Sequence, residues 1–195
     1  TRYWRDWSSG RVLFRSSGMR VIDACAGAGG KSLHLAALMN NRGRIISMDV
    51  EPRKLEELTR RSRKNGVSII EPRLIDSTKV IKRLHEQADR LLLDVPCSGS
   101  GVIRRNPDSK YRVNKEYVER LLKVQEDILE RYSSMLKPGG KMVYATCSLF
   151  SMENEEQVAK FIAKHPEFVV EEQKYVYPSE NDSDGFFMAR LIKNK

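Results

Sequence analysis

The chain has 195 residues, a length typical of one domain with its own hydrophobic core. It carries 35 Lys and Arg against 26 Asp and Glu, which gives a formal net charge of +9 and a pI near 9.5. This excess favours a polyanionic partner (RNA, DNA or an anionic membrane surface) through counterion release, and it specifies no activity. Three cysteines without a CxxC pair argue against a disulfide framework and a zinc site.

No apolar run approaches the roughly 20 residues of a membrane span, and no signal-peptide pattern opens the chain. We therefore expect one cytoplasmic, monomeric domain over residues 1–195, with no membrane contact and no metal. Thr1 is not an initiator methionine, and the chain opens in mid-pattern with "TRYWRDWSSGRV". We also expect an upstream region that these residues do not include.

Apolar runs of strand length alternate with helical periodicity along the whole chain. The first half predicts strands at 19–25, 44–50 and 68–74, separated by helices at 30–41 and 52–65. The second half predicts a short helix at 78–88, a strand at 90–96, a long helix at 114–136 stopped by "KPGG", a strand at 141–146, a helix at 152–164, and strands at 168–178 and 185–192 joined by the polar loop "SENDSD". This alternation indicates an α/β fold, with a mostly parallel, doubly wound sheet and a C-terminal antiparallel hairpin.

All three cysteines fall at the carboxyl ends of predicted strands, where doubly wound sheets bind their ligands. Cys25 ends the first strand, Cys97 follows the fourth by one residue, and Cys147 ends the fifth. These three strands are usually neighbours in such sheets, so we expect Cys97 and Cys147 to face one pocket. For Cys25, a role as a small buried hydrophobic residue is equally open.

The first strand-to-helix turn reads "CAGAGGKS", whose backbone N–H groups can approach an anionic ligand at a helix N-terminus. The turn is not a complete GxGxxG, because Ser32 takes the place of the last glycine. Nor is it a P-loop GxxxxGK[ST], because Cys25 takes the place of the first glycine of that motif. Lys31 opposes the dipole of its helix by about 0.3–1 kcal/mol, which favours a functional contact with an anion or a reacting base.

Acidic side chains follow three other strand ends. Asp49 lies about 20 residues beyond the glycines, where a carboxylate can accept hydrogen bonds from ribose hydroxyls, and Asp76 is placed to meet an adenine amino group. A turn or cap role is the alternative for each. With the glycine turn they outline an adenosine site. Asp94 ends an apolar run and, as a buried acid, needs a partner.

Two charged segments remain. Arg104, Arg105, Lys110 and Arg112 share one loop and could meet phosphates, although such a loop is as often solvated. In "SMENEE" the acids Glu153, Glu155 and Glu156 need no catalytic role, because they complement the dipole of the helix that they open.

Six segments, "DACAGAGGK", "LLDVPCSGSG", "NPD", "LKPGG", "YATCS" and "DGFFMARL", together resemble the RNA cytosine-5 methyltransferases of the Fmu/Sun family. The likeness runs from "DWSS" at Asp6 to the C-terminus. It departs from the family in the turn, which is commonly "CAAPGGK" and here lacks the proline. The resemblance implies a Rossmann-like methyltransferase fold, S-adenosylmethionine as methyl donor, no metal, an RNA substrate (ribosomal more than transfer RNA) and an upstream RNA-binding region.

The resemblance also implies roles for individual residues. Cys147 would attack carbon 6 of cytosine, Cys97 would help the methylated base to leave, and Asp94 and Lys31 would hold the cytosine edge. Cys147 needs a lowered pKa for this, from a helix N-terminus or a nearby cation such as Lys31. The residues implied to bind the cofactor are Cys25, Ala26, Gly27, Ala28, Gly29, Gly30, Lys31, Asp49, Asp76 and Asp94.

Three other readings stay open. A P-loop nucleotide hydrolase would use "GGKS" as a phosphate cradle, but it leaves Cys97 and Cys147 unexplained. A methyltransferase of exocyclic amines would typically carry [DN]PP[YF] where this chain has "DVPC". A non-catalytic RNA-binding module would keep the pocket without methyl transfer.

Overall fold

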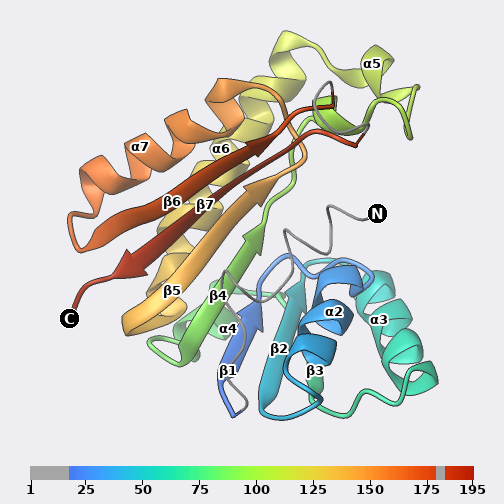
Figure 1. Cartoon of the computed structure of the whole chain (residues 1–195), viewed down its shortest axis with the longest axis vertical. Helices are drawn as coiled ribbons and strands as arrows, with labels where there is room; N and C mark the ends of the chain where they lie inside the picture. The colour runs from blue at the N-terminus through green and yellow to red at the C-terminus, as the bar shows by residue number, and fades with distance from the viewer. Residues whose placement is uncertain (1–17, 179–182) are drawn as a thin grey trace.

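The computed structural model describes residues 18–178 and 183–195; the "DWSS" segment and residues 179–182 of the hairpin loop lie outside the described residues. The described strands form a seven-stranded sheet in the order β3-β2-β1-β4-β5-β7-β6 (Figure 1). They are β1 (Arg20–Asp23), β2 (Arg44–Asp49), β3 (Ile70–Leu74), β4 (Ala88–Asp94), β5 (Leu136–Thr146), β6 (Phe168–Val176) and β7 (Phe186–Lys193). The first five run parallel, and β7 pairs antiparallel with both β5 and β6, which confirms the predicted sheet and its C-terminal hairpin.

Helices cover both faces of the sheet, with α2 and α3 on one side and α4, α6 and α7 on the other (Figure 1). They are α2 (Gly30–Leu38), α3 (Pro52–Lys64), α4 (Thr78–Lys82), α5 (Ser109–Arg112), α6 (Lys115–Tyr132) and α7 (Glu155–Lys164), with 3₁₀ turns at Ser100–Val102, Ser133–Met135 and Ser151–Glu153. None of the helices in this part of the chain is both long and apolar enough to cross a membrane.

The core is divided by the sheet into two apolar layers, and successive strand residues alternate between them. Leu91 and Leu93 of β4 belong to the layer under α4, α6 and α7, whereas Leu92 belongs to the layer under α2. Met142 and Val143 of β5 divide in the same way. Because side chains alternate along a strand, a continuous apolar run marks a strand that is buried on both faces.

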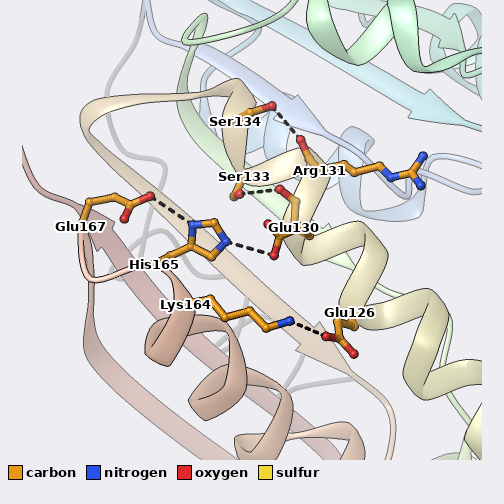
Figure 2. Close-up of polar contacts among 8 residues, drawn as sticks. All are labelled: Glu126, Glu130, Arg131, Ser133, Ser134, Lys164, His165 and Glu167. Carbon is orange, nitrogen blue, oxygen red and sulfur yellow. Dashed lines mark hydrogen bonds and ion pairs between the residues drawn. The ribbon is translucent and has the colours of Figure 1, made fainter.

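Helix α6 ends at Tyr132, four residues before the predicted end at 136, and "KPGG" lies inside β5 rather than after the helix. Figure 2 shows the local cause: the Ser133 hydroxyl donates to the Glu130 carbonyl at 3.3 Å and the Ser134 hydroxyl to the Arg131 carbonyl at 2.6 Å. Serine hydroxyls that take the last helical carbonyls favour a tighter turn. The chain then enters β5, where Leu136 lies opposite Ala88 of β4.

The C-terminal end of α7 is joined to α6 by two side-chain contacts, also drawn in Figure 2. Lys164 pairs with Glu126 at 2.7 Å, and the His165 ring lies between Glu130 at 3.0 Å and Glu167 at 3.2 Å. Exposed pairs of this kind contribute little to stability, typically about 0–1 kcal/mol each. Helix α7 is held mainly by Val158 and Phe161, which are buried in the core layer that it shares with α6.

Candidate active site

The glycine turn after β1 is built around one position that only glycine can occupy. Strand β1 ends at Asp23, so Cys25 lies inside the turn rather than on the strand. Gly29 caps α2 with a φ of 83°, and a Cβ there would lie 2.6 Å from Leu58 Cγ on α3. Arg61 of α3 donates to the Ala28 carbonyl at 2.7 Å. Helix α3 therefore holds the turn from one side.

Asp49 ties this turn to the end of β2. Its Oδ2 accepts a hydrogen bond from the Gly27 amide at 2.9 Å and its Oδ1 accepts one from the Glu51 amide at 2.9 Å. Asp76, just after β3, is exposed, and its Oδ1 accepts from the Ser77 hydroxyl at 2.9 Å. Both carboxylates thus lie at the carboxyl edge of the sheet, as the sequence predicts, while their contacts with a nucleoside stay predictions.

The turn has space beside it for a ligand. A Cβ built on Gly27 or on Gly30 would meet no atom within 4 Å, which is open space at two glycines that α3 does not cover. The helix N-terminus that begins at Gly30 offers backbone N–H groups to an anionic ligand such as a carboxylate. These residues fit the amino-acid and ribose portions of an adenosyl cofactor.

Cys97 and Cys147 lie side by side at the ends of β4 and β5. Their Sγ atoms are 3.2 Å apart, and the Cys147 amide donates to Cys97 Sγ at 3.3 Å. The loop after Cys97 folds back over this pair, since the Gly101 amide donates to the Cys147 carbonyl at 2.9 Å. The proximity expected from the two strand ends is confirmed.

The two thiols have opposite acidities. The hydrogen bond from Cys97 lowers the pKa of Cys147, and the positive charge of Lys31 lowers it further against the opposing effects of burial and Asp94. The same hydrogen bond, together with burial, raises the pKa of Cys97. These directions favour Cys147 as the sulfur that ionises more readily and Cys97 as the donor in the hydrogen bond between them.

Lys31 and Asp94 form an ion pair beside the thiols, with the Lys31 Nζ donating to Asp94 Oδ2. This contact explains a lysine in the first turn of a helix, because its charge is taken by a carboxylate from the end of β4. Burial raises the pKa of the Asp94 carboxyl, although Lys31 draws it down. The ion pair thus places one positive and one negative group together at the carboxyl edge of the sheet, where each compensates the burial of the other.

Cys25 is set apart from this pair in both packing and acidity. It packs against the core layer under α4, α6 and α7. Burial and the nearby carboxylates of Asp23, Asp94 and Asp49 raise the pKa of its thiol. The surroundings of Cys25 therefore favour its protonated form, whereas the hydrogen bond from Cys97 favours the thiolate of Cys147.

Two acids that the sequence interpretation did not place in the site are completely buried there. Glu153 was expected to serve the dipole of α7, and this is wrong: its buried carboxylate accepts hydrogen bonds from the Ser98 amide and from the hydroxyls of Ser98 and Ser148, so it contacts both cysteine loops. Glu155 and Glu156 do lie in the first turn of α7. Asp23, at the end of β1, accepts from the Ser32 hydroxyl at 2.6 Å. Asp23 could have been noticed in the sequence, because it lies four residues before Gly27, the first glycine of the turn. The local sequence offers no such signal for Glu153.

The loop between Cys97 and α6 carries the four predicted cations, and all four are exposed. Arg105 is not free for a phosphate, because its Nε pairs with Asp184 at 2.5 Å and so joins this loop to the start of β7. Lys110 lies over the Tyr111 ring at 4.9 Å from its centroid. Across the described ranges, no group of three or more His, Cys, Asp and Glu side chains is arranged to hold a metal ion.

Solved structures share this fold. The structure of PH0851 superposes with a TM-score of 0.87 at 34% identity, over 91% of this chain and 43% of that one. NSun6 from Pyrococcus horikoshii, solved with SFG, superposes with a TM-score of 0.82 at 29% identity, over 91% of this chain and 48% of that one. The fold and its neighbours define a methyltransferase of the Rossmann-like class.

The family follows from the sequence comparisons. The model of the 16S rRNA methyltransferase RsmB/F family matches residues 11–192, so the chain belongs to that family. It is 36% identical to the "Probable ribosomal RNA small subunit methyltransferase B" of Bacillus subtilis (strain 168), over 94% of this chain and 45% of that protein. It is also 36% identical to the ribosomal RNA small subunit methyltransferase B of Vibrio vulnificus (strain YJ016), over 90% of this chain and 42% of that protein. The chain thus spans less than half the length of these curated relatives.

Proposed function

We propose that this chain transfers a methyl group from S-adenosylmethionine to carbon 5 of a cytosine in RNA, through a covalent adduct with Cys147. The observation that carries the proposal is the pair of sulfur atoms 3.2 Å apart, one with a lowered and one with a raised pKa. Small-subunit ribosomal RNA is the proposed substrate class, because the curated relatives are named for it.

The cofactor assignment is supported by the glycine turn and by a relative. The NSun6 structure contains SFG, an analogue of S-adenosylmethionine. Here the turn from Cys25 to Lys31 would face the amino-acid portion of the cofactor, Asp49 the ribose, and Asp76 the adenine. The bound cofactor supplies an electrophilic methyl group on a sulfonium sulfur.

The cysteine is needed because carbon 5 of cytosine is a weak nucleophile. The Cys147 thiolate adds to carbon 6, which forms a carbon–sulfur bond and moves an electron pair of the ring toward carbon 5. Carbon 5 would then take the methyl group, and the sulfur–methyl bond of the donor would break to leave a neutral thioether. A base would accept the proton from carbon 5, and the electron pair of that C–H bond would restore the aromatic ring as the carbon–sulfur bond breaks and releases Cys147 as a thiolate.

The neighbours of Cys147 match this sequence of steps. Lys31 stabilises the thiolate before addition, and Asp94 and Lys31 together meet the polar edge of the base. Cys97 donates a hydrogen bond to the thiolate and assists the departure of the methylated base. Because the reacting atoms are inaccessible in a stacked helix, the target base must be unstacked, which favours a single-stranded or loop segment of RNA.

The test is methyl transfer from labelled S-adenosylmethionine to transcribed small-subunit ribosomal RNA, made with the full-length protein. Cys147→Ala is expected to abolish transfer, whereas Cys97→Ala is expected to leave the enzyme on RNA as a denaturant-resistant adduct. Ser151→Ala, at an exposed position four residues after Cys147, is the matched control. Full turnover by Cys147→Ala, or methyl groups located anywhere but carbon 5, would contradict the proposal.

The P-loop alternative is tested by ligand binding. In a nucleotide hydrolase the lysine of "GGKS" would be available to phosphates, whereas Lys31 here is paired with Asp94. We expect tight binding of S-adenosylmethionine and no comparable binding of ATP with Mg²⁺.

A further inference from the structure

Glu153 is a buried carboxylate that the reaction as proposed does not use. It is completely inaccessible to solvent, yet it lies in a 3₁₀ turn between two polar segments. Its Oε1 accepts from the Ser98 amide at 2.8 Å and from Gln125 Nε2 at 3.0 Å, and its Oε2 accepts from the hydroxyls of Ser98 and Ser148. A buried carboxylate needs such donors, and these four occupy the positions that it offers.

The donors are not distributed at random around the acid. Ser98 directly follows Cys97 and Ser148 directly follows Cys147, so one carboxylate contacts both cysteine loops at the residue next to each sulfur. Gln125 of α6 also contacts the residue before Cys97, because its Nε2 donates to the Pro96 carbonyl at 3.0 Å.

The residue after Glu153 completes the contact with the Cys147 loop. The Thr146 hydroxyl donates to Asn154 Oδ1, and Asn154 Nδ2 donates to the Ser148 carbonyl at 3.0 Å. Both residues that flank Cys147 are thereby held from one short segment. Tyr144 in the core of β5 fixes that segment, since its hydroxyl donates to the Glu153 carbonyl at 2.7 Å.

We propose that Glu153 is a positioning residue that sets the distance between Cys97 and Cys147 and so keeps the hydrogen bond from one sulfur to the other. This inference rests on the proposed cysteine chemistry. Without the carboxylate, the Ser98 and Ser148 hydroxyls lose their common acceptor. The loops then keep only weaker neutral contacts, such as the 3.2 Å contact between these two hydroxyls and the 2.9 Å bond from the Gly101 amide to the Cys147 carbonyl. A misplacement of about 1 Å in a reacting group can cost on the order of 100-fold in rate.

The direction of the change in the pKa of Cys147 distinguishes a positioning role of Glu153 from a simple effect of its charge. Removal of a nearby negative charge favours the thiolate and, acting alone, lowers the pKa of Cys147. Loss of the Cys97 hydrogen bond does the opposite, because that bond is the main cause of the lowered pKa. An upward movement of the pKa in a variant that has lost the Glu153 charge therefore reports a change of geometry.

The experiment measures alkylation of Cys147 by iodoacetamide against pH, read by peptide mass spectrometry in the full-length protein without RNA. Glu153→Gln is expected to move the apparent pKa of Cys147 upward, to slow methyl transfer about 10- to 100-fold, and to leave the affinity for S-adenosylmethionine unchanged. The control is Glu156→Gln, which removes the same charge from an exposed position bonded to the Ser151 hydroxyl at 2.7 Å. It should match the parent protein in all three measurements.

If Glu153→Gln does not fold, Ser148→Ala serves instead, because it removes the hydroxyl by which the Cys147 loop contacts the carboxylate and leaves the carboxylate bound to Ser98 and Gln125. The inference is overturned if the apparent pKa of Cys147 from the alkylation profile is unchanged or lower in the variant. It is also overturned if the methyl-transfer rate falls only together with stability or cofactor affinity, with no change in that pKa. The proposed function fails separately: a fully active Cys147→Ala protein would refute the chemistry and would not alter the alkylation result.

Discussion

Asp23 makes folding stability depend on pH in a way that can be calculated from its surroundings. It is completely buried at the end of β1, and burial raises its pKa from 3.8 to about 6, with Asp94 adding to the effect and Ser32 and Lys31 opposing it. The folded protein therefore holds more protons than the unfolded chain between about pH 4 and pH 6, so the Asp23 contribution to the free energy of unfolding falls as pH rises through that window. Two pKa units correspond to about 3 kcal/mol.

The perturbation is Asp23→Asn, which keeps the shape and removes the titration. An amide also changes the hydrogen bond with Ser32, which adds an offset that does not vary with pH. We expect the variant minus parent difference in unfolding free energy to increase by about 2 kcal/mol from pH 4 to pH 7, because the unfolded carboxyl is already partly ionised at pH 4. Urea denaturation followed by circular dichroism at pH 4, 5, 6 and 7 measures this difference.

Asp89→Asn is the control of opposite sign. Burial pushes the pKa of Asp89 up, but Lys137 and the Arg20 amide outweigh it and hold that pKa below its ordinary value. Its variant should lose stability relative to the parent as pH rises through the acidic range below about pH 4, so this control is measured from about pH 2.5 to 4, and its difference should be nearly flat from pH 4 to pH 7. A difference for Asp23→Asn that is flat from pH 4 to pH 7, or that decreases, would refute the burial argument.

Two further substitutions test the loop and the ion pair. Gly101→Ala would place a Cβ 2.2 Å from the Gly185 carbonyl oxygen, so it should destabilise the protein by about 1–3 kcal/mol in thermal or urea unfolding. Gly30→Ala is the control, because its Cβ meets no atom within 4 Å and should not destabilise the protein. Equal effects of the two substitutions would contradict the packing argument. Lys31→Met removes the cation that lowers the pKa of Cys147, so iodoacetamide alkylation of Cys147 should require higher pH, and an unchanged profile would exclude Lys31 as a stabiliser of the thiolate.

Much of the site followed from the position of residues relative to strand ends. Parallel strands bring their carboxyl ends to one edge, and β4 and β5 are adjacent in the sheet. The proximity of Cys97 and Cys147 was therefore predictable from two apolar runs, each ending near a cysteine. The positions of Asp49 and the glycine turn followed in the same way, because they depend on the backbone path of a β-α unit and not on distant partners, whereas their roles in binding a nucleoside stay predictions.

The contacts that decide chemistry were not predictable in that way. The local sequence around a charged residue near a helix start is the same whether its side chain faces water or lies in the core. Glu153 was therefore assigned to the dipole of α7, although it is buried between Ser98 and Ser148. The end of α6 was also misplaced, because serine hydroxyls that bind the last carbonyls leave no distinct mark in apolar periodicity.

The sequence by itself determined the alternation of strands and helices and the edge at which the cysteines lie, because both depend on periodicities of two and of 3.6 residues within short segments. Only the tertiary structure decided which of the two thiols has its pKa lowered. That choice depends on the hydrogen bond between Cys97 and Cys147 and on the charge of Lys31, and these three groups come from separate segments that meet only when the sheet is formed.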